Sequence, residues 1–264
     1  MKIIVSIKQV PDTSGKVAVN PDGTLNRASM QTITNPDDMN ALEAALKIKD
    51  ATGCKVVVVT MGPPPAAGML REALAMGADE AVLVSAREFG GSDTYATSQI
   101  LAAAINKIGV EADDIVMCGR QAIDGDTAQV GPEIAEHLGL PQVTYGLEAE
   151  VDGDTVKVKK EVEEGVEVIG VKMPCLLTFT KPAWDPRYPT IKRKMAANRA
   201  EIPTLTAADL PTIDLTQAGL KGSPTKVKKT FVPQKKSGGV KIKEETAEDS
   251  AKKLFQLLSD ASII

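Results

Sequence analysis

The strongest constraint on the fold is a regular alternation of short apolar runs and helix-type segments through residues 1–180. The apolar runs are residues 2–9, 55–61, 81–84, 114–118, 142–145 and 175–180. Between them, residues 36–52, 66–76, 93–108 and 127–138 have apolar side chains at helical spacing. Such repeats join parallel strands through right-handed crossovers and place helices on both faces of the sheet. We therefore predict an α/β, doubly wound, mostly parallel Rossmann-like sheet.

Local signals refine this prediction at several turns. Asn35 is a preferred N-cap residue, Pro36 suits the first helical position, and Gly53 is a typical helix end. Residues 17–24 contain an Asp-Gly pair and predict a short hairpin. Residues 147–173 alternate apolar and polar side chains around a second Asp-Gly turn, which predicts a small antiparallel appendage.

The composition changes after residue 180. Residues 1–180 hold 15 Lys and Arg against 26 Asp and Glu, a net charge of −11, whereas residues 181–241 hold 13 against 4, a net charge of +9. Pro, Lys and Gly are frequent in this second stretch and long apolar periodicity is missing. We predict a nucleotide-binding domain over residues 1–180 and a partner-wrapping arm over residues 181–264 that ends in a helix at 246–259. A disordered tail is the alternative, but recurring apolar residues favour an arm with anchors.

Composition also argues against several functions. A net charge of −4 gives no support for nucleic-acid binding. One histidine and three widely spaced cysteines make a metal site improbable, and buried thiols are the simpler interpretation. No apolar run approaches the roughly 20 residues that cross a bilayer. Because the chain begins directly with a strand-type run, we expect a cytoplasmic protein without a membrane span.

One loop between a strand and a helix is suited to phosphate. The Rossmann pattern G-x-G-x-x-G and the P-loop pattern are both missing from the sequence. Residues 119–131 (loop 119–131) follow a strand, and Gly119 and Gly125 allow close approach and a tight turn. Asp126 or Thr127 is expected to cap the next helix, whose free N–H groups favour an anion. An ordinary capped connection remains the alternative.

A second loop, residues 89–94 (loop 89–94), also precedes a helix. Two glycines and a hydroxyl in Gly90, Gly91 and Ser92 make a plausible nest for a pyrophosphate, with Asp93 or Thr94 at the helix start. A plain helix entry is equally compatible with this pattern. Two such loops in one domain suggest either two dinucleotides or one dinucleotide and one ordinary loop.

Loop 119–131 resembles the nucleotide-binding loop of electron-transfer flavoprotein beta subunits. Residues 6–13, 35–36, 61–63, 71–79, 185–191 and 194–195 are similar to segments of that family in the same order. The resemblance covers nearly the whole chain. Residues 124–132, loop 89–94 and residues 222–227 are similar to signatures of the electron-bifurcating, NADH-oxidising group. Asp37 stands where the family usually has an aromatic residue.

The resemblance implies a heterodimer with an FAD-containing alpha subunit. It implies FAD in this chain, or AMP as the alternative, NADH as electron donor, and ferredoxin or flavodoxin as one acceptor. An acyl-CoA dehydrogenase is the other implied partner. The nucleotide site would be lined by Ser6, Asn35, Asp37, Met61, Gly119, Arg120, Gln121, Ala122, Asp124, Gly125, Asp126, Thr127, Ala128, Gln129, Val130 and Gly131. NADH would lie against Gly90, Gly91, Ser92, Asp93 and Thr94.

Partner docking is implied for a basic stretch after residue 186. By resemblance, the docking residues are Arg187, Tyr188, Ile191, Lys192, Arg193 and Met195, with Ile191 as the inserted apolar side chain. A solvated basic loop is the alternative. No catalytic side chain is required, because flavin and nicotinamide carry the chemistry. A structural AMP-binding subunit and an ATP-hydrolysing or nucleotide-sensing domain of the same fold are the rival functions.

Overall fold

A computed structural model describes residues 1–12, 31–228 and 238–264. The hairpin predicted at residues 17–24 lies outside these ranges. The chain forms two compact units, Met1–Lys228 and Lys229–Ile264. The first unit contains the whole sheet, and the second contains one helix.

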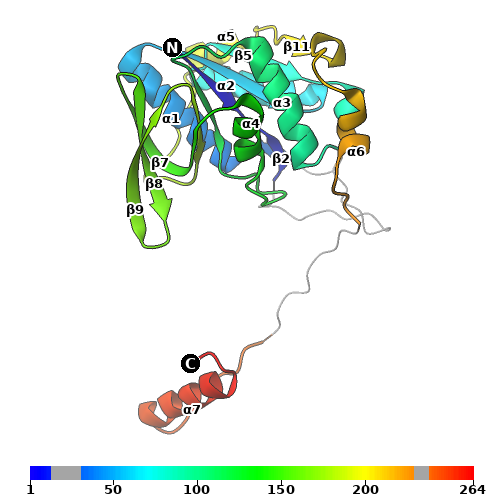
Figure 1. Ribbon diagram of the computed structural model, residues 1–264. Coiled ribbons are helices and arrows are strands. Elements are labelled where there is room, and N and C mark those ends of the chain that lie inside the picture. Colours follow the sequence, from blue (N-terminus) through cyan, green and yellow to red (C-terminus); the bar gives the residue numbers. More distant parts are fainter. Residues whose placement is uncertain (13–30, 229–237) are drawn as a thin grey trace. The chain divides into compact units, whose positions relative to one another are not determined.

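The core of the first unit is a nine-stranded sheet with the order β11-β5-β4-β1-β6-β10-β7-β8-β9 (Figure 1). The strands from β11 to β7 are parallel, and β8 and β9 continue the sheet in antiparallel fashion. The strands are β1 (Lys2–Ser6), β4 (Lys55–Met61), β5 (Glu80–Val84), β6 (Ile115–Gly119), β7 (Gln142–Asp152), β8 (Thr155–Val162), β9 (Gly165–Lys172), β10 (Cys175–Phe179) and β11 (Thr204–Leu205). The predicted α/β fold is therefore confirmed.

Helices cover both faces of the sheet because alternate strand residues point to opposite sides. Ile3 and Val5 of β1 pack into one core cluster, and Ile4 packs into the other. The first cluster includes residues of α1 and α2, and the second includes residues of α3 and α4 (Figure 1). These helices are α1 (Pro36–Thr52), α2 (Ala67–Met76), α3 (Thr94–Ile108) and α4 (Val130–Leu138).

The apolar run at residues 2–9 is not one strand. β1 ends at Ser6, and β2 (Gln9–Pro11) pairs antiparallel with β3 (Thr32–Thr34) in a separate two-stranded sheet. The antiparallel appendage is confirmed. It is an extension of β7, which runs as one strand from the core of the sheet to Asp152. The first strand therefore turns aside at the point where the sheet ends, which leaves the Ser6 end of β1 accessible.

Compact packing continues past residue 180, the predicted boundary between domain and arm. β11 adds a parallel strand beside β5, and α5 (Ile191–Ala197) packs on α2. The 3₁₀ turns η4 (Ala207–Asp209) and η5 (Leu215–Gln217) and the short helix α6 (Gly219–Gly222) follow. Residues 181–228 therefore belong to the first compact unit, and their wrapping around a partner stays a prediction. Anchors such as the buried Leu210 hold this stretch on its own chain.

The second unit contains the predicted terminal helix, α7 (Ala247–Asp260). The Thr246 side chain caps it by accepting from the Asp249 N–H at 3.1 Å, and Glu248 and Asp249 lie in its first turn. Leu254 and Phe255 of this helix are exposed. The helix prediction at residues 246–259 is confirmed to within one residue at each end.

Candidate functional site

A cavity of about 1280 Å³ lies at the carboxyl ends of four neighbouring parallel strands. Its walls include the last residues of β1, β4, β5 and β6, which are Ser6, Met61, Val84 and Gly119. The chain runs outward from β1 through β4 to β5 and then returns to β6 on the other side of β1. Ligands of open α/β sheets bind at such a reversal of strand order.

Asp38 connects the two strands at this reversal. Its Oδ1 accepts the Gly119 N–H and its Oδ2 accepts the Lys8 N–H, each at 2.8 Å. Burial raises the pKa of Asp38 to about 7, although the two backbone donors act in the opposite direction. Asp38 also lines the cavity. A buried carboxylate of α1 therefore sets the separation of the β1 and β6 ends.

Asn35 holds loop 119–131 and does not cap α1 through its side chain. Its Nδ2 donates to the Gln121 carbonyl at 2.7 Å, and its Oδ1 accepts from the Ile123 N–H at 3.1 Å. Asn35 is therefore the N-cap residue of α1, as predicted, but its side chain makes no capping hydrogen bond. The residue is fully buried and supports the loop from below the cavity.

The helix that follows this loop begins later than predicted. α4 begins at Val130, not near residue 127, and its N-cap is Gln129, which gives no side-chain cap. Asp126 and Thr127 are therefore not the caps, and Asp126 instead accepts from Gln121 Nε2 at 2.8 Å. The helix N–H groups at its start meet the cavity without a side-chain cap, as an anion site requires.

Gly125 lies in a turn, as predicted, and its N–H donates to the Ala122 carbonyl at 3.1 Å. The left-handed residues of the loop are Asp126 and Ala128, with φ of 51° and 54°, and not Gly125. At Gly119, a Cβ would lie 2.5 Å from Asp38 Oδ1 and 2.6 Å from the Asp37 carbonyl carbon. The close approach that requires Gly119 is therefore that of α1.

Two predicted residues form an ion pair beside the cavity. Arg120 Nε lies 3.3 Å from Asp37 Oδ2, in a geometry that is ionic and not a hydrogen bond. Burial raises the pKa of Asp37, and the positive charge of Arg120 opposes this shift. Arg120 lines the cavity, and it lies 5.8 Å from the centre of the Tyr145 ring. Asp37 therefore acts on the cavity through its ion pair with Arg120.

Loop 89–94 forms another wall of the cavity. Asp93 is the N-cap of α3, as one of the two predicted candidates, and its Oδ1 accepts the Ala96 N–H at 3.1 Å. Gly91 has a φ of 78°, so a glycine is favoured there. The Gly90 N–H is already used by the Arg87 carbonyl at 3.2 Å. Gly90 therefore does not supply the free N–H group that was expected.

Residues 219–227, here called the strap, lie against loop 89–94. Ser223 Oγ accepts the Asp93 N–H at 2.8 Å, and the Leu220 N–H donates to the Gly90 carbonyl at 3.1 Å. Thr225 donates its N–H and its hydroxyl to Asp93 Oδ2. Thr225 and Val227 line the cavity. The structure thus brings together two segments that were singled out separately in the sequence.

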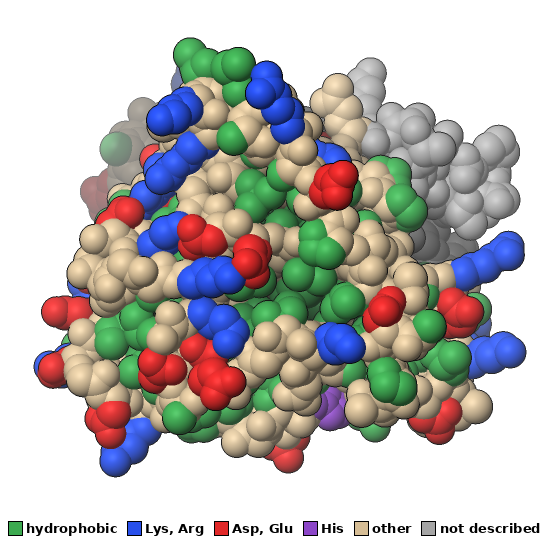
Figure 2. Space-filling model, turned by 90° about the horizontal axis from the view of Figure 1, so that it is seen from above, with side chains coloured by type: hydrophobic (Ala, Val, Ile, Leu, Met, Phe, Trp, Pro, Cys, Tyr) green, Lys and Arg blue, Asp and Glu red, His purple; other side chains and the backbone are tan. Residues whose placement is uncertain are grey.

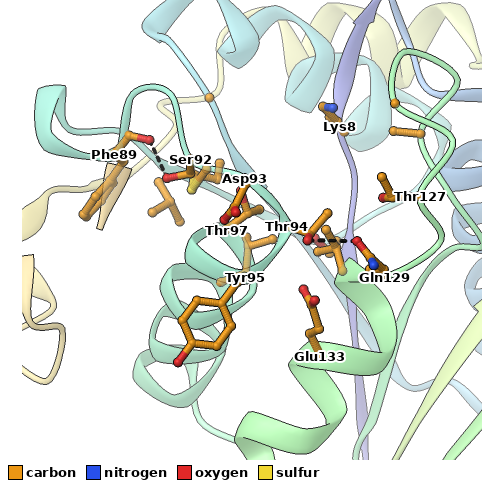
Figure 3. Close-up of a pocket in the computed structure, with 18 of the residues that line it drawn as sticks. Lys8, Phe89, Ser92, Asp93, Thr94, Tyr95, Thr97, Thr127, Gln129 and Glu133 are labelled. Atoms are coloured by element: carbon orange, nitrogen blue, oxygen red, sulfur yellow. Dashed lines mark hydrogen bonds between the residues drawn. The ribbon is translucent and has the colours of Figure 1, made fainter. Parts of the chain in front are cut away.

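The two loops meet at the starts of α3 and α4. Thr94 Oγ1 donates to Gln129 Oε1 at 3.0 Å, which joins the first residue of α3 to the N-cap of α4 (Figure 3). Lys8 lies in the same cavity and its Nζ is 2.7 Å from Asp124 Oδ1. Two helix N-termini therefore face one cavity, and both favour negative charge.

The docking residues lie elsewhere on the first unit and are in two groups. Tyr188, Ile191 and Met195 are 93, 82 and 57 % exposed. Arg187 instead donates to the buried Glu43 carboxylate at 2.9 Å, and Arg193 donates to the Met76 carbonyl at 3.1 Å. Lys192 is exposed on α5. The face in Figure 2 mixes basic, acidic and hydrophobic side chains instead of presenting one sign of charge.

Sequence reasoning missed Lys8, Asp38 and Glu133, all of which line the cavity. Asp38 was noted only as a helix-start acid, and Glu133 only as part of a helix. Within the described ranges, no helix is both long and apolar enough to cross a membrane. In the same residues, no group of three or more His, Cys, Asp or Glu side chains is suited to a metal ion.

Comparison with known proteins agrees with this site. The model of the electron transfer flavoprotein domain matches residues 22–210, so the chain belongs to the electron transfer flavoprotein family. Relatives named as beta subunits are similar to it over nearly their whole length. The acryloyl-CoA reductase electron transfer subunit gamma of Anaerotignum propionicum is 57% identical over 97% of this chain and 98% of its own length.

Two further relatives cover the chain end to end or nearly so. The electron transfer flavoprotein subunit beta of Clostridium acetobutylicum is 54% identical over 95% of each chain. The caffeyl-CoA reductase-Etf complex subunit CarD of Acetobacterium woodii is 48% identical over 100% of each chain. The resemblance to electron-transfer flavoprotein beta subunits is therefore confirmed, and electron transport is the shared activity.

Proposed function

We propose that this beta subunit holds FAD in the cavity, accepts electrons from NADH at loop 89–94, and bifurcates them. One electron goes toward the alpha-subunit FAD and an acyl-CoA dehydrogenase, and the other goes toward ferredoxin or flavodoxin. The observation that carries the proposal is one continuous cavity whose walls include both loops and the strap. A single mononucleotide would contact only part of those walls.

The size of the cavity supports two nucleotides. Its volume of about 1280 Å³ is above the roughly 300–1,000 Å³ typical of small-molecule sites. AMP alone would leave much of this space to solvent. FAD along loop 119–131 with NADH along loop 89–94 uses both helix N-termini.

The residues present fit the phosphates of FAD. The uncapped start of α4 offers backbone N–H groups, and its dipole favours an anion. Lys8 and Arg120 add two cations at the cavity wall, although each already faces an acidic side chain. FAD, when bound, supplies the redox chemistry by taking a hydride from NADH and passing electrons on singly. The chain's own residues bind and orient the cofactor, and they exclude water from it.

Loop 89–94 suits the NADH side for a related reason. Asp93 caps α3 and fixes the strap, so the loop backbone is held in place before a ligand arrives. Gly91 keeps a left-handed backbone, and its missing side chain makes room for Leu220 of the strap. The loop is thus preorganised for a bulky ligand, with few bonds left to form.

The deciding experiment is the cofactor content of the purified complex with its alpha subunit. The proposal predicts two FAD for each heterodimer and flavin reduction by NADH in the absence of any dehydrogenase. One FAD and one AMP, with no reduction by NADH, would support the AMP-binding alternative. A colourless chain that hydrolyses ATP would support the third candidate.

A further inference from the structure

One carboxylate in the cavity has an oxygen without a partner. Glu133 lines the cavity from the first turn of α4, and its Oε2 is buried with no hydrogen-bond partner among the described residues. Figure 3 shows the Glu133 side chain directed toward the region of Thr94 and Gln129. The Thr94 hydroxyl cannot satisfy it, because that hydroxyl already donates to Gln129.

A buried carboxylate oxygen without a donor is costly, so such an atom in a binding cavity indicates a donor on the ligand. The start of α4 attracts negative charge, yet the chain places its own negative charge there. A phosphate held by the free N–H groups of α4 would therefore lie away from the Glu133 carboxylate. The part of the ligand that reaches Glu133 must be a neutral group with hydroxyl or amide hydrogens.

The position of Glu133 indicates which ligand this is. Gln129 and Glu133 are four residues apart, so they share one face of the chain at the start of α4. Gln129 on that face accepts a hydrogen bond from Thr94 of α3, so the face is turned toward the end of loop 89–94. Glu133 is thus on the side of the cavity assigned to NADH.

We propose that Glu133 is a specificity-determining residue that accepts a hydrogen bond from the adenosine ribose 2′-hydroxyl of NADH and rejects NADPH. A carboxylate at a ribose accepts from the diol and repels a 2′-phosphate, as in other dinucleotide sites. This inference rests on the proposed use of NADH. It adds a physical reason for the site to bind NADH in preference to NADPH.

The test measures flavin reduction in the complex with the alpha subunit, using NADH and NADPH in turn. The wild-type complex should prefer NADH. Glu133→Gln should lower the ratio of kcat/KM for NADH to kcat/KM for NADPH by about tenfold, which is the effect of losing one well-formed interaction. Glu133→Asp should keep the preference but raise the KM for NADH. Glu136→Gln, an exposed residue on the same helix, removes the same charge and should leave the ratio unchanged.

The outcomes separate this inference from the proposed function. An unchanged ratio in Glu133→Gln with normal NADH reduction overturns the role of Glu133 alone. Loss of the beta-site FAD in Glu133→Gln also overturns it, because Glu133 would then serve the other ligand. No reduction of the wild-type complex by NADH overturns the proposed function and this inference with it.

Discussion

Thr225 donates both its backbone N–H and its hydroxyl to Asp93 Oδ2, at 2.9 and 2.8 Å, across 132 residues of sequence. The other oxygen of the same carboxylate caps α3 through the Ala96 N–H. One side chain therefore fixes both the start of a helix and the strap that walls the cavity. Partial burial alone would raise the pKa of Asp93, but the hydrogen bonds from Thr225 and Ala96 lower it overall.

Replacing Asp93 by Asn should weaken the attachment of the strap, because an amide has one acceptor oxygen and cannot accept from both Thr225 and the Ala96 N–H. We expect a loss of about 1–2 kcal/mol in the free energy of unfolding and a raised KM for NADH. Limited proteolysis should cut more rapidly near residue 225. Asp214→Asn is the control, since Asp214 makes the same two bonds to Thr216 within its own turn. Equal behaviour of both variants would contradict the role of the strap.

Gly119→Ala should be strongly destabilising, because its Cβ would overlap the start of α1. We expect a loss of about 2–3 kcal/mol, typical of overpacking where the neighbour is backbone. Gly125→Ala should change stability by less than about 0.5 kcal/mol, since nothing lies within 4 Å of its Cβ and its φ is not left-handed. Thermal unfolding of both variants decides the matter, and a well-tolerated Gly119→Ala would show that the strand end can shift.

Stability should depend on pH through Asp38. Its pKa is about 7 in the folded protein against 3.8 for the ordinary group, so the folded state holds a proton that the unfolded state releases. The contribution of Asp38 to the free energy of unfolding therefore falls as pH rises from about 4 to 7. Asp38→Asn removes this titration. The difference between wild type and variant should shrink across that window, and a constant difference would refute the shift.

Arg187 should act mainly in stability and not in docking. Its guanidinium pairs with Glu43, which is only 5% exposed, and with Asp50 at the surface. Arg187→Ala leaves a buried carboxylate without its partner, and we expect a loss of about 3 kcal/mol. Lys181→Ala, whose pair with Asp185 is exposed on both sides, should cost less than about 1 kcal/mol. Chemical denaturation measures both, and similar values would show that Glu43 finds another donor.

Ile191 should behave in the opposite way. Because it is 82% exposed at the start of α5, Ile191→Ala should leave the unfolding midpoint almost unchanged. Electron transfer to the acyl-CoA dehydrogenase should weaken, while NADH oxidation with an artificial dye is spared. Val168→Ala, on the exposed strand β9, is a matched control and should affect neither assay. Loss of both activities in Ile191→Ala would mean that the residue is structural.

The strands and helices of the sheet domain could be predicted because short-range patterns in the sequence determine them. The valine run of residues 56–59 forms the buried β4, and the pattern after Pro36 forms α1. The same holds for Asp93, whose side chain caps the helix that its position predicts. In each case, hydrophobic period and capping chemistry agree with the final packing.

The remainder depended on contacts between distant residues. Asn35 has a capping position, but its side chain is used by loop 119–131, 86 residues away. Thr127 looks like a cap, yet Ala128 after it is left-handed and delays α4. The pairing of Asp93 with Thr225 has no local signal in either segment. Tertiary context overrides local preference at these points. Several of them line the cavity, namely Asp93, Thr127, Ala128 and Thr225.

Because the strap lies late in the sequence, it is synthesised after the strands of the sheet. Every strand of the sheet has been synthesised once residue 205 is made, whereas Thr225 and Val227 come about twenty residues later. At the roughly 5–20 residues per second of translation, this leaves an interval of about one to four seconds. During that time the nascent chain contains the sequence of every strand but lacks one wall of the cavity. A message truncated after codon 210 would therefore yield a chain with all the strand sequences and a cavity without the strap.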